Sequence, residues 1–157
     1  SNSPPRGFLL FRVRYRTNSV HGIFSEWLTC FLGEKEMSTI ELTQENFEET
    51  IRNNEMVLVD FWAPWCGPCR TFGPVYEAVA EKHPQIVFAK VNTQDEQELA
   101  GSFQVRSIPT LMVFRDEVLL FAQAGALPGN VLEDLIDKVK ELDMEEVRRE
   151  IEEKEKN

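Results

Sequence analysis

The sequence feature that most constrains the fold is a pair of cysteines, Cys66 and Cys69, at the junction of two apolar patterns. Residues 56–62 form a near-continuous apolar run, which is typical of a β-strand buried on both faces. From the cysteines onward, apolar side chains such as Tyr76 recur at helical spacing, and Pro74 within this pattern predicts a kink. A buried strand that leads into a helix at a Cys-x-x-Cys pair predicts an α/β domain with reactive sulfur at the junction.

Strand and helix patterns alternate through the middle of the chain. The predicted elements, in chain order, are an edge strand at 39–42, a helix capped by Thr43, the buried strand at 56–62, a helix from the cysteines to residue 82, a strand at 86–91, a helix at 94–103, two strands at 110–114 and 118–122 around the turn 115–117, and a helix at 129–142. Strands that alternate with helices and end in a hairpin indicate a mixed β-sheet covered by α-helices.

Charge marks a boundary in the chain near Met37. The whole chain has a net charge of −10 and residues 1–37 have +2, so the remaining residues carry −12. The basic first segment is either an organelle transit peptide or upstream sequence ahead of a start at Met37, and both interpretations stay open. Residues 143–157 are almost all charged and are expected to form a solvated helical tail, with a partner-binding coil as the alternative. We therefore divide the chain into segments 1–37, 38–142 and 143–157, of which the second is the functional domain.

Composition argues against two classes of function. No apolar stretch approaches the roughly 18 residues that a membrane-spanning helix needs. The acidic net charge argues against binding to nucleic acid, because neutralising phosphates requires clustered Lys and Arg. We expect a monomer with no membrane or nucleic-acid partner, located in the cytoplasm, or in an organelle if residues 1–37 are a transit peptide. The third cysteine, Cys30, is expected to be an ordinary thiol, since three cysteines do not make a disulfide framework.

The position of the cysteine pair predicts redox chemistry. A cysteine at a helix N-terminus faces unpaired backbone N–H groups and the positive end of the helix dipole, which both favour the thiolate. Cys66 should therefore have a depressed pKa and act as the nucleophile. Cys69 lies one helical turn later on the same face, where it can attack a mixed disulfide formed at Cys66 and release the product. Pro68 stands in the first turn, where its missing N–H group costs least.

Two other interpretations of the cysteine pair are weaker. A structural zinc site needs four ligands, and the other candidates, Cys30, His21 and His83, lack zinc-finger spacing, so we expect no bound metal. Inert core cysteines would not be expected beside Trp65 and Gly67-Pro68, which are unusual at the start of a packed helix.

Two charged residues interrupt the buried strands. Asp60 lies within the run 56–62, where burial would raise the pKa of its carboxyl group and suit it to exchange a proton with Cys69. The alternative is that Asp60 lies at an exposed strand end. Lys90 interrupts the strand 86–91, either as the charge partner of Asp60 or with its ammonium group extended to solvent.

The residues from Val59 to Arg70, which include Trp65-Cys66-Gly67-Pro68-Cys69, resemble the active-site signature of the thioredoxin family. The resemblance covers residues 38–142, with further matching motifs at 88–92, 106–110 and 125–126. It implies the thioredoxin fold, in which α-helices flank both faces of a central mixed β-sheet. The turn 115–117 departs from the family pattern, because it lacks the usual glycine and is one residue short.

The resemblance also implies a role for each catalytic residue. Cys66 corresponds to the attacking thiolate and Cys69 to the resolving thiol. Asp60 corresponds to the buried acid that assists Cys69 by proton transfer, with Lys90 near it.

A substrate-binding surface is implied in the same way. Pro109 corresponds to a cis-proline that faces the disulfide, although the sequence alone leaves the Ile108–Pro109 bond as either cis or trans. The surface around the exposed sulfur is formed by Trp65, Gly67, Pro68, Ile108, Pro109, Gly125 and Ala126, with Trp62 as structural support beneath it.

The expected function is a protein-disulfide reductase that uses dithiol–disulfide exchange at Cys66 and Cys69 and supplies electrons to target proteins. Gly67-Pro68 favours reduction, because disulfide-forming relatives usually have a His in that pair. No bound cofactor is expected, since NADPH acts only indirectly, through a thioredoxin reductase that recharges the dithiol. Such an enzyme serves electron transport and cell redox homeostasis. The alternatives are a docking subunit whose redox chemistry is incidental, and an oxidoreductase for exported proteins, which needs a functioning leader.

Overall fold

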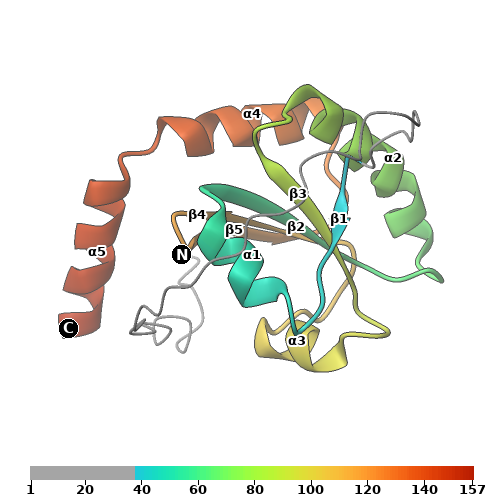
Figure 1. The fold of residues 1–157 in the computed structure, drawn as a ribbon, viewed down its shortest axis with the longest axis horizontal. Coiled ribbons are helices and arrows are strands. Elements are labelled where there is room, and N and C mark those ends of the chain that lie inside the picture. The colour runs from blue at the N-terminus through green and yellow to red at the C-terminus, as the bar shows by residue number, and fades with distance from the viewer. Residues whose placement is uncertain (1–37) are drawn as a thin grey trace, which may run out of the picture. The chain divides into compact units, whose positions relative to one another are not determined.

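The structure of the chain is a computed structural model that describes residues 38–157. The expectations for Cys30 and for a transit peptide lie outside the described residues. The elements, shown in Figure 1, are β1 (Ile40–Glu41), α1 (Phe47–Asn53), β2 (Met56–Trp62), α2 (Gly67–Lys82), β3 (Val87–Asn92), α3 (Gln97–Ser102), β4 (Thr110–Arg115), β5 (Val118–Ala124), α4 (Gly129–Glu141) and α5 (Met144–Lys156).

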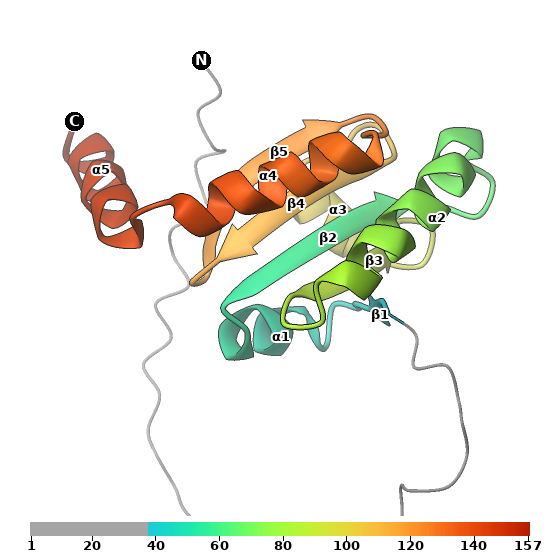
Figure 2. The same ribbon diagram turned by 90° about the horizontal axis from the view of Figure 1, so that it is seen from above.

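The five strands form one mixed sheet in the order β1-β3-β2-β4-β5. β1, β3 and β2 are parallel to one another, β4 is antiparallel to β2, and β5 is antiparallel to β4. Helices α2 and α4 lie on one face of the sheet, and α1 and α3 lie on the other (Figures 1 and 2). The predicted fold class, a mixed sheet with helices on both faces, is therefore confirmed.

β2 lies at the centre of the sheet because almost all of its side chains are apolar. Its residues from Met56 to Phe61 are buried, and it pairs with β3 on one side and β4 on the other. On the α2 and α4 face, Leu58 belongs to a core cluster with Phe72 and Tyr76 of α2. On the opposite face four phenylalanines pack with ring centroids 5.0 to 5.9 Å apart: Phe47, Phe61, Phe103 and Phe114. This packing on both faces fixes the backbone that leads from β2 to the cysteines.

Some element boundaries differ from the sequence expectation. Thr43 does not cap α1: the N-cap is Asn46, whose Oδ1 atom accepts a hydrogen bond from the Thr43 N–H at 2.7 Å. Helix α3 begins at Gln97 rather than at residue 94, because the N–H groups of residues 95 and 96 bond to the Asn92 carbonyl in a turn. The edge strand β1 has two residues where four were predicted.

The connection between β4 and β5 is a two-residue turn, where three residues were expected. Arg115 pairs with Val118 across the hairpin, so Asp116 and Glu117 form the loop. Both loop residues have positive φ, 49° for Asp116 and 67° for Glu117. This is the pattern of a type I′ turn, in which Asn-Gly is the favoured pair.

The charged tail forms α5, which extends beyond the C-terminal end of α4 (Figures 1 and 2). The Asp143 carboxylate caps this helix, since its Oδ1 atom accepts hydrogen bonds from the N–H groups of Glu145 and Glu146 at 2.9 and 3.3 Å. Met144 is buried, and Arg148 pairs with Asp116 of the hairpin turn at 3.4 Å. Within residues 38–157, none of the helices is both long and apolar enough to cross a membrane.

Candidate active site

The cysteine pair lies where β2 leads into α2. Cys66 has an extended backbone and is the N-cap of α2, and Cys69 lies in the first helical turn with Pro68 beside it. The two sulfur atoms form a disulfide, with Cα atoms 5.2 Å apart. The Cys66 Sγ atom also accepts a hydrogen bond from the Cys69 N–H at 3.2 Å. Cys66 Sγ is therefore held where the positive end of the helix dipole stabilises negative charge.

A loop from the other side of the sheet lies against the disulfide. Cys66 Sγ lies 3.7 Å from the carbonyl oxygen of Ile108. The Ile108–Pro109 peptide bond is cis, which is the isomer implied by the family resemblance. The Pro109 carbonyl accepts a hydrogen bond from the Gly125 N–H at 2.8 Å, which ties this loop to the end of β5. Three segments distant in sequence thus meet at Cys66: the start of α2, the loop before β4 and the loop after β5.

The surface around the disulfide is apolar and exposed. Trp65 is 69% exposed, and Gly67, Pro68, Gly125 and Ala126 are also exposed. Ile108 is half-buried and Pro109 is buried. Cys66 itself is only 4% exposed in the disulfide form, less than expected for an exposed sulfur, because Ala63, Trp62 and Ile108 pack around the pair. We call the residues expected to bind substrate the rim: Trp65, Gly67, Pro68, Ile108, Pro109, Gly125 and Ala126.

Asp60 is buried within β2, two residues before Trp62, which packs against the disulfide, and the alternative of an exposed strand end is wrong. The residue is 0% exposed, and neither carboxylate oxygen has a hydrogen-bond partner in the part of the chain that the structure describes. Burial raises the pKa of Asp60 from 3.8 to about 7, and the positive charge of Lys90 opposes part of that rise. A carboxyl group with a pKa near 7 can take up or release a proton at neutral pH.

Lys90 acts on Asp60 through the electric field and forms no ion pair with it within residues 38–157. The two residues are register partners on β2 and β3. The Lys90 Nζ atom lies 4.6 Å from the centre of the Trp62 ring, so the ammonium group makes a cation–π contact and the side chain is half-buried. Trp62 in turn packs against the disulfide, as the supporting role expected of it requires.

Sequence periodicity identified Tyr76 only as a core position of α2. In the structure its hydroxyl group lies among backbone polar groups of β2 and β3. Tyr76 is fully buried. Its oxygen accepts a hydrogen bond from the Ala89 N–H at 3.1 Å and lies 2.9 Å from the carbonyl oxygens of both Leu58 and Ala89, to which it donates its proton. The pKa of Tyr76 is raised well above 10 by burial and by the charge of Asp60, and the hydrogen bond to Ala89 lowers it in part. Because a buried tyrosine usually needs a hydrogen-bond partner for its hydroxyl group, a tyrosine at a core position of α2 could have predicted this contact from the sequence.

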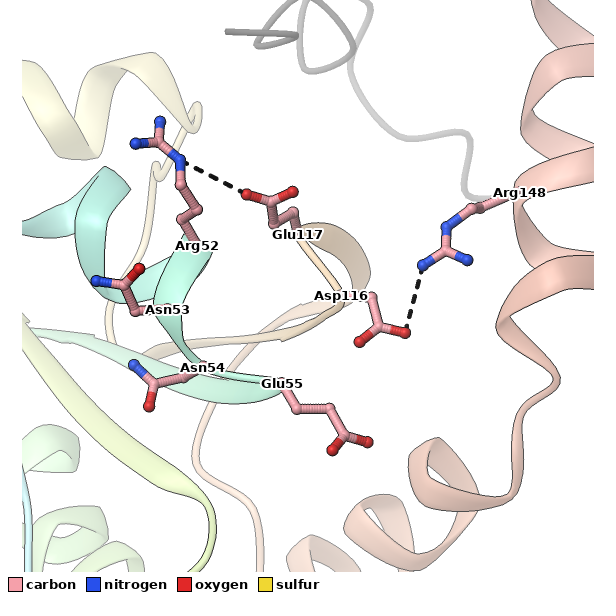
Figure 3. A pocket seen from close by; sticks show the side chains of 7 residues that line it. All are labelled: Arg52, Asn53, Asn54, Glu55, Asp116, Glu117 and Arg148. Carbon is pink, nitrogen blue, oxygen red and sulfur yellow. Dashed lines mark hydrogen bonds and ion pairs between the residues drawn. The ribbon is translucent and has the colours of Figure 1, made fainter. Parts of the chain in front are cut away.

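A pocket of ≈ 380 Å³ lies at the opposite end of β2 (Figure 3). β2 runs from Met56, which pairs with Arg115 beside this pocket, to Trp62, which packs against the disulfide. The pocket is lined by Arg52, Asn53, Asn54, Glu55, Asp116, Glu117 and Arg148. Arg52 pairs with Glu117 at 3.8 Å and Arg148 with Asp116 at 3.4 Å, so the lining charges already compensate one another. This pocket is separate from the redox site.

No group of three or more His, Cys, Asp or Glu side chains is arranged to hold a metal ion within residues 38–157.

Comparison with known proteins identifies the same region. Residues 38–138 match the sequence profile of the family described as Thioredoxin. The chain is 57% identical over 112 residues to "Putative thioredoxin 2" of Streptomyces coelicolor, which covers 71% of this chain and 84% of that protein. It is 43% identical over 104 residues to the thioredoxin of Porphyra purpurea, covering 65% of this chain and 97% of that protein. A mutant thioredoxin from Halobacterium salinarum superposes with a TM-score of 0.63 at 33% identity, covering 71% of this chain and 99% of that one.

Proposed function

This chain belongs to the thioredoxin family and is a thiol–disulfide oxidoreductase that reduces protein disulfides through Cys66 and Cys69; from that premise we propose how its residues divide the reaction and what recharges it. Cys66 is the nucleophile, Cys69 is the resolving thiol and Asp60 transfers the proton. The observation that supports this division is the N-cap position of Cys66, together with the buried carboxyl group of Asp60 on the strand that leads to the pair.

The reaction proceeds in two exchanges. The Cys66 thiolate attacks one sulfur of a substrate disulfide, the substrate S–S bond breaks, and a mixed disulfide forms while the first substrate sulfur leaves as a thiolate. Cys69 then loses its proton to the Asp60 carboxylate and attacks Cys66 Sγ. The second substrate sulfur leaves and the Cys66–Cys69 disulfide forms, which is the state in the structure. The two substrate thiolates take up protons, one of them supplied by Asp60.

The rim gives the site its breadth of substrates. Trp65 and its exposed neighbours offer apolar contact area that depends little on the sequence of the substrate. The Ile108 carbonyl beside Cys66 Sγ offers a backbone acceptor to an extended segment next to the substrate cysteine. These two features support a general reductase rather than one with a single target.

The recharging partner is a flavin-dependent thioredoxin reductase that draws on NADPH, which places the chain in electron transport and cell redox homeostasis. Gly67-Pro68 between the cysteines supports the reducing direction. The location we propose is the cytoplasm, or an organelle if residues 1–37 act as a transit peptide. Sequencing the N-terminus of the native protein distinguishes these two locations.

The deciding experiment is insulin disulfide reduction driven by NADPH and a thioredoxin reductase, with wild type compared with Cys66→Ser. Turnover that vanishes in the variant establishes a reductase with Cys66 as its nucleophile. If wild type shows no turnover while thiol titration finds the dithiol intact, the assay is repeated with dithiothreitol. Activity that returns indicates a mismatched reductase, and continued inactivity overturns the proposal.

The exposed rim also suits a second role, as a docking subunit whose redox chemistry is incidental. A Cys66→Ser, Cys69→Ser double variant keeps the rim and removes the chemistry. Cellular function that survives in this variant supports docking, and function that is lost supports the reductase.

A further inference from the structure

Two arginines lie on segments that contact Cys66, and neither is used by the reaction as described. Arg70 lies at the start of α2, four residues after the N-cap Cys66, and its N–H donates to the Cys66 carbonyl at 3.2 Å. Arg106 lies two residues before Ile108, whose carbonyl oxygen is 3.7 Å from Cys66 Sγ. The two arginines therefore lie on α2 and on the loop before β4, the two segments that meet at Cys66.

Both arginines are exposed, and within residues 38–157 neither guanidinium group forms an ion pair or a hydrogen bond. The other arginines that the structure describes behave differently, since Arg52, Arg115 and Arg148 all form ion pairs with carboxylates; Arg149 on α5 is the exception. Two exposed guanidinium groups without a partner among the described residues, on segments that meet at the nucleophile, are available to a substrate.

The local charge contrasts with that of the rest of the domain. Three segments meet at Cys66, residues 63–70, 104–109 and 123–131, and they contain two arginines and no Asp, Glu or Lys. Residues 38–157 as a whole carry a net charge of −12, so the remainder carries −14. Asp60, the acid of the redox site, is 0% exposed, and Asp95 and Glu96 before α3 accept hydrogen bonds from Asn92 and from the Gln44 N–H. An approaching segment therefore meets an apolar surface bordered by positive charge.

We propose that Arg70 and Arg106 make this site selective for disulfides whose attacked cysteine is flanked by Asp or Glu; the inference rests on the reductase function proposed above. Guanidinium groups bind carboxylates by paired, charge-assisted hydrogen bonds, and the planar group suits the carboxylate geometry. Each exposed pair of this kind contributes little binding free energy. We therefore expect each arginine to favour the acidic substrate over a neutral one by roughly 2- to 5-fold in rate. The rim provides general affinity, and the arginines discriminate among substrates by charge.

The test uses three synthetic peptides, each with one internal disulfide, identical except that the first cysteine is flanked on both sides by Glu, by Gln or by Lys. The reduced protein is the sole reductant, and peptide thiols are followed in a single turnover, so that no reductase partner enters the measurement. We expect the Glu peptide to react fastest and the Lys peptide slowest. The difference should shrink at about 1 M salt, where the screening length is about 3 Å.

The variants separate docking from activation of the thiolate. Arg70→Gln and Arg106→Gln should each reduce the rate with the Glu peptide by roughly 2- to 5-fold and leave the Gln peptide nearly unchanged. Arg149→Gln is the matched control, because Arg149 is an exposed arginine on α5 without a partner among the described residues, and it should leave all three rates unchanged. Hydroxyethyl disulfide, which is small and neutral, should react equally with every variant.

Three outcomes overturn the inference. Equal rates for the three peptides with wild type show that the site does not select by charge, although the reductase function stands. A loss that extends to hydroxyethyl disulfide shows that the arginine acts on the Cys66 thiolate rather than on the substrate, and alkylation of Cys66 against pH then shows a raised thiol pKa. Failure of wild type to reduce any of these disulfides overturns both the inference and the function on which it rests.

Discussion

At the scale of single residues, Asp60 makes the stability of the domain depend on pH. Its pKa is about 7 in the folded chain, against 3.8 for an ordinary aspartate. Between these values the folded state holds a proton that the unfolded chain has released, so the free energy of unfolding falls as pH rises. At 1.36 kcal/mol for each unit of pKa, the loss between pH 4 and pH 8 is about 4 kcal/mol.

Asp60→Asn replaces the protonated carboxyl group with a neutral group of the same size, so it should abolish this loss. Urea unfolding of the oxidised proteins should show nearly equal stability at pH 4.5, and a variant that is more stable by about 4 kcal/mol at pH 8. The difference between the two proteins isolates Asp60, because the other titrating groups are shared. A constant difference from pH 4.5 to pH 8 would contradict the raised pKa.

The same substitution should slow the redox reaction, because an amide group cannot accept the proton of Cys69. Insulin reduction at pH 7 should decrease, and the defect should diminish as pH rises and more Cys69 ionises without help. A variant that matches wild type at pH 7 would show that Asp60 has no part in proton transfer.

The ring of Tyr76 packs in the core, and its hydroxyl group bonds backbone groups of two strands. Tyr76→Phe keeps the ring that packs in the core but leaves buried backbone groups of β2 and β3 without a partner, so we expect a loss of about 1–3 kcal/mol in the free energy of unfolding. Hydrogen exchange gives the local readout, since the Ala89 N–H should exchange faster while the Val91 N–H follows global stability. Unchanged exchange at Ala89 would mean that another acceptor replaces the hydroxyl.

Side-chain identity explains why the residues of the site were easier to predict than their contacts. The spacing of Cys66 and Cys69 and the lone acid in an apolar strand are visible in the sequence. The choice for Lys90 between Asp60 and solvent depends on the position of the Trp62 ring, to which the ammonium group is drawn. Tertiary neighbours of this kind lie outside any local pattern.

At the scale of elements, the β4–β5 hairpin is strained by its own sequence. Non-glycine residues in the left-handed region cost about 1–2 kcal/mol, and Glu117 has φ 67°. Its exposed ion pair with Arg52 is worth at most about 1 kcal/mol. Glu117→Gly should therefore stabilise the domain by about 1 kcal/mol, measured by urea unfolding. Glu117→Ala removes the same carboxylate but keeps Cβ, and it should give no such gain; equal effects of the two variants would rule out backbone strain as the cause.

Helix α5 depends on a single cap. The Asp143 carboxylate holds the N–H groups of residues 145 and 146, so Asp143→Ala should cost the helix about 1 kcal/mol and increase fraying. Hydrogen exchange in α5 should accelerate while insulin reduction is unchanged, because α5 extends beyond α4 and lies apart from α2, the helix that begins at the cysteines (Figure 1). Asp143→Asn is the control, as asparagine also caps. Equal protection in the Ala variant would show that Met144 and Arg148 hold the helix instead.

The type and order of the elements could be predicted because apolar periodicity is a local signal. Strand β2 and helix α2 follow their patterns almost residue for residue. The misplaced boundaries at Thr43 and before α3 occur where side chains and turns compete with the helix. Asn46 accepts a hydrogen bond from the Thr43 N–H, and Asn92 accepts hydrogen bonds from the N–H groups of residues 94, 95 and 96. Such competition depends on individual hydrogen bonds and not on periodicity.

At the scale of the whole molecule, residues 38–157 should suffice for the fold and the redox site. They form one compact unit that holds the five-stranded sheet, both helix layers and every residue to which a role is assigned. The family match begins at residue 38 and ends at residue 138, so it includes the cysteines and the loops that meet at them. Residues 38–157 should therefore fold and react as an independent domain.

A chain that begins at Ser38 should unfold in urea at the same midpoint as the full chain and reduce insulin at the same rate. A second chain, of residues 38–142, lacks α5 and loses the buried contact of Met144 and the Arg148–Asp116 pair, so it should unfold at a slightly lower midpoint with unchanged activity. Reduced activity in the first chain, at equal stability, would assign residues 1–37 a part in catalysis or substrate binding. Reduced activity in the second chain alone would assign that part to α5, and the helix would then be a component of the substrate site rather than an extension of the fold.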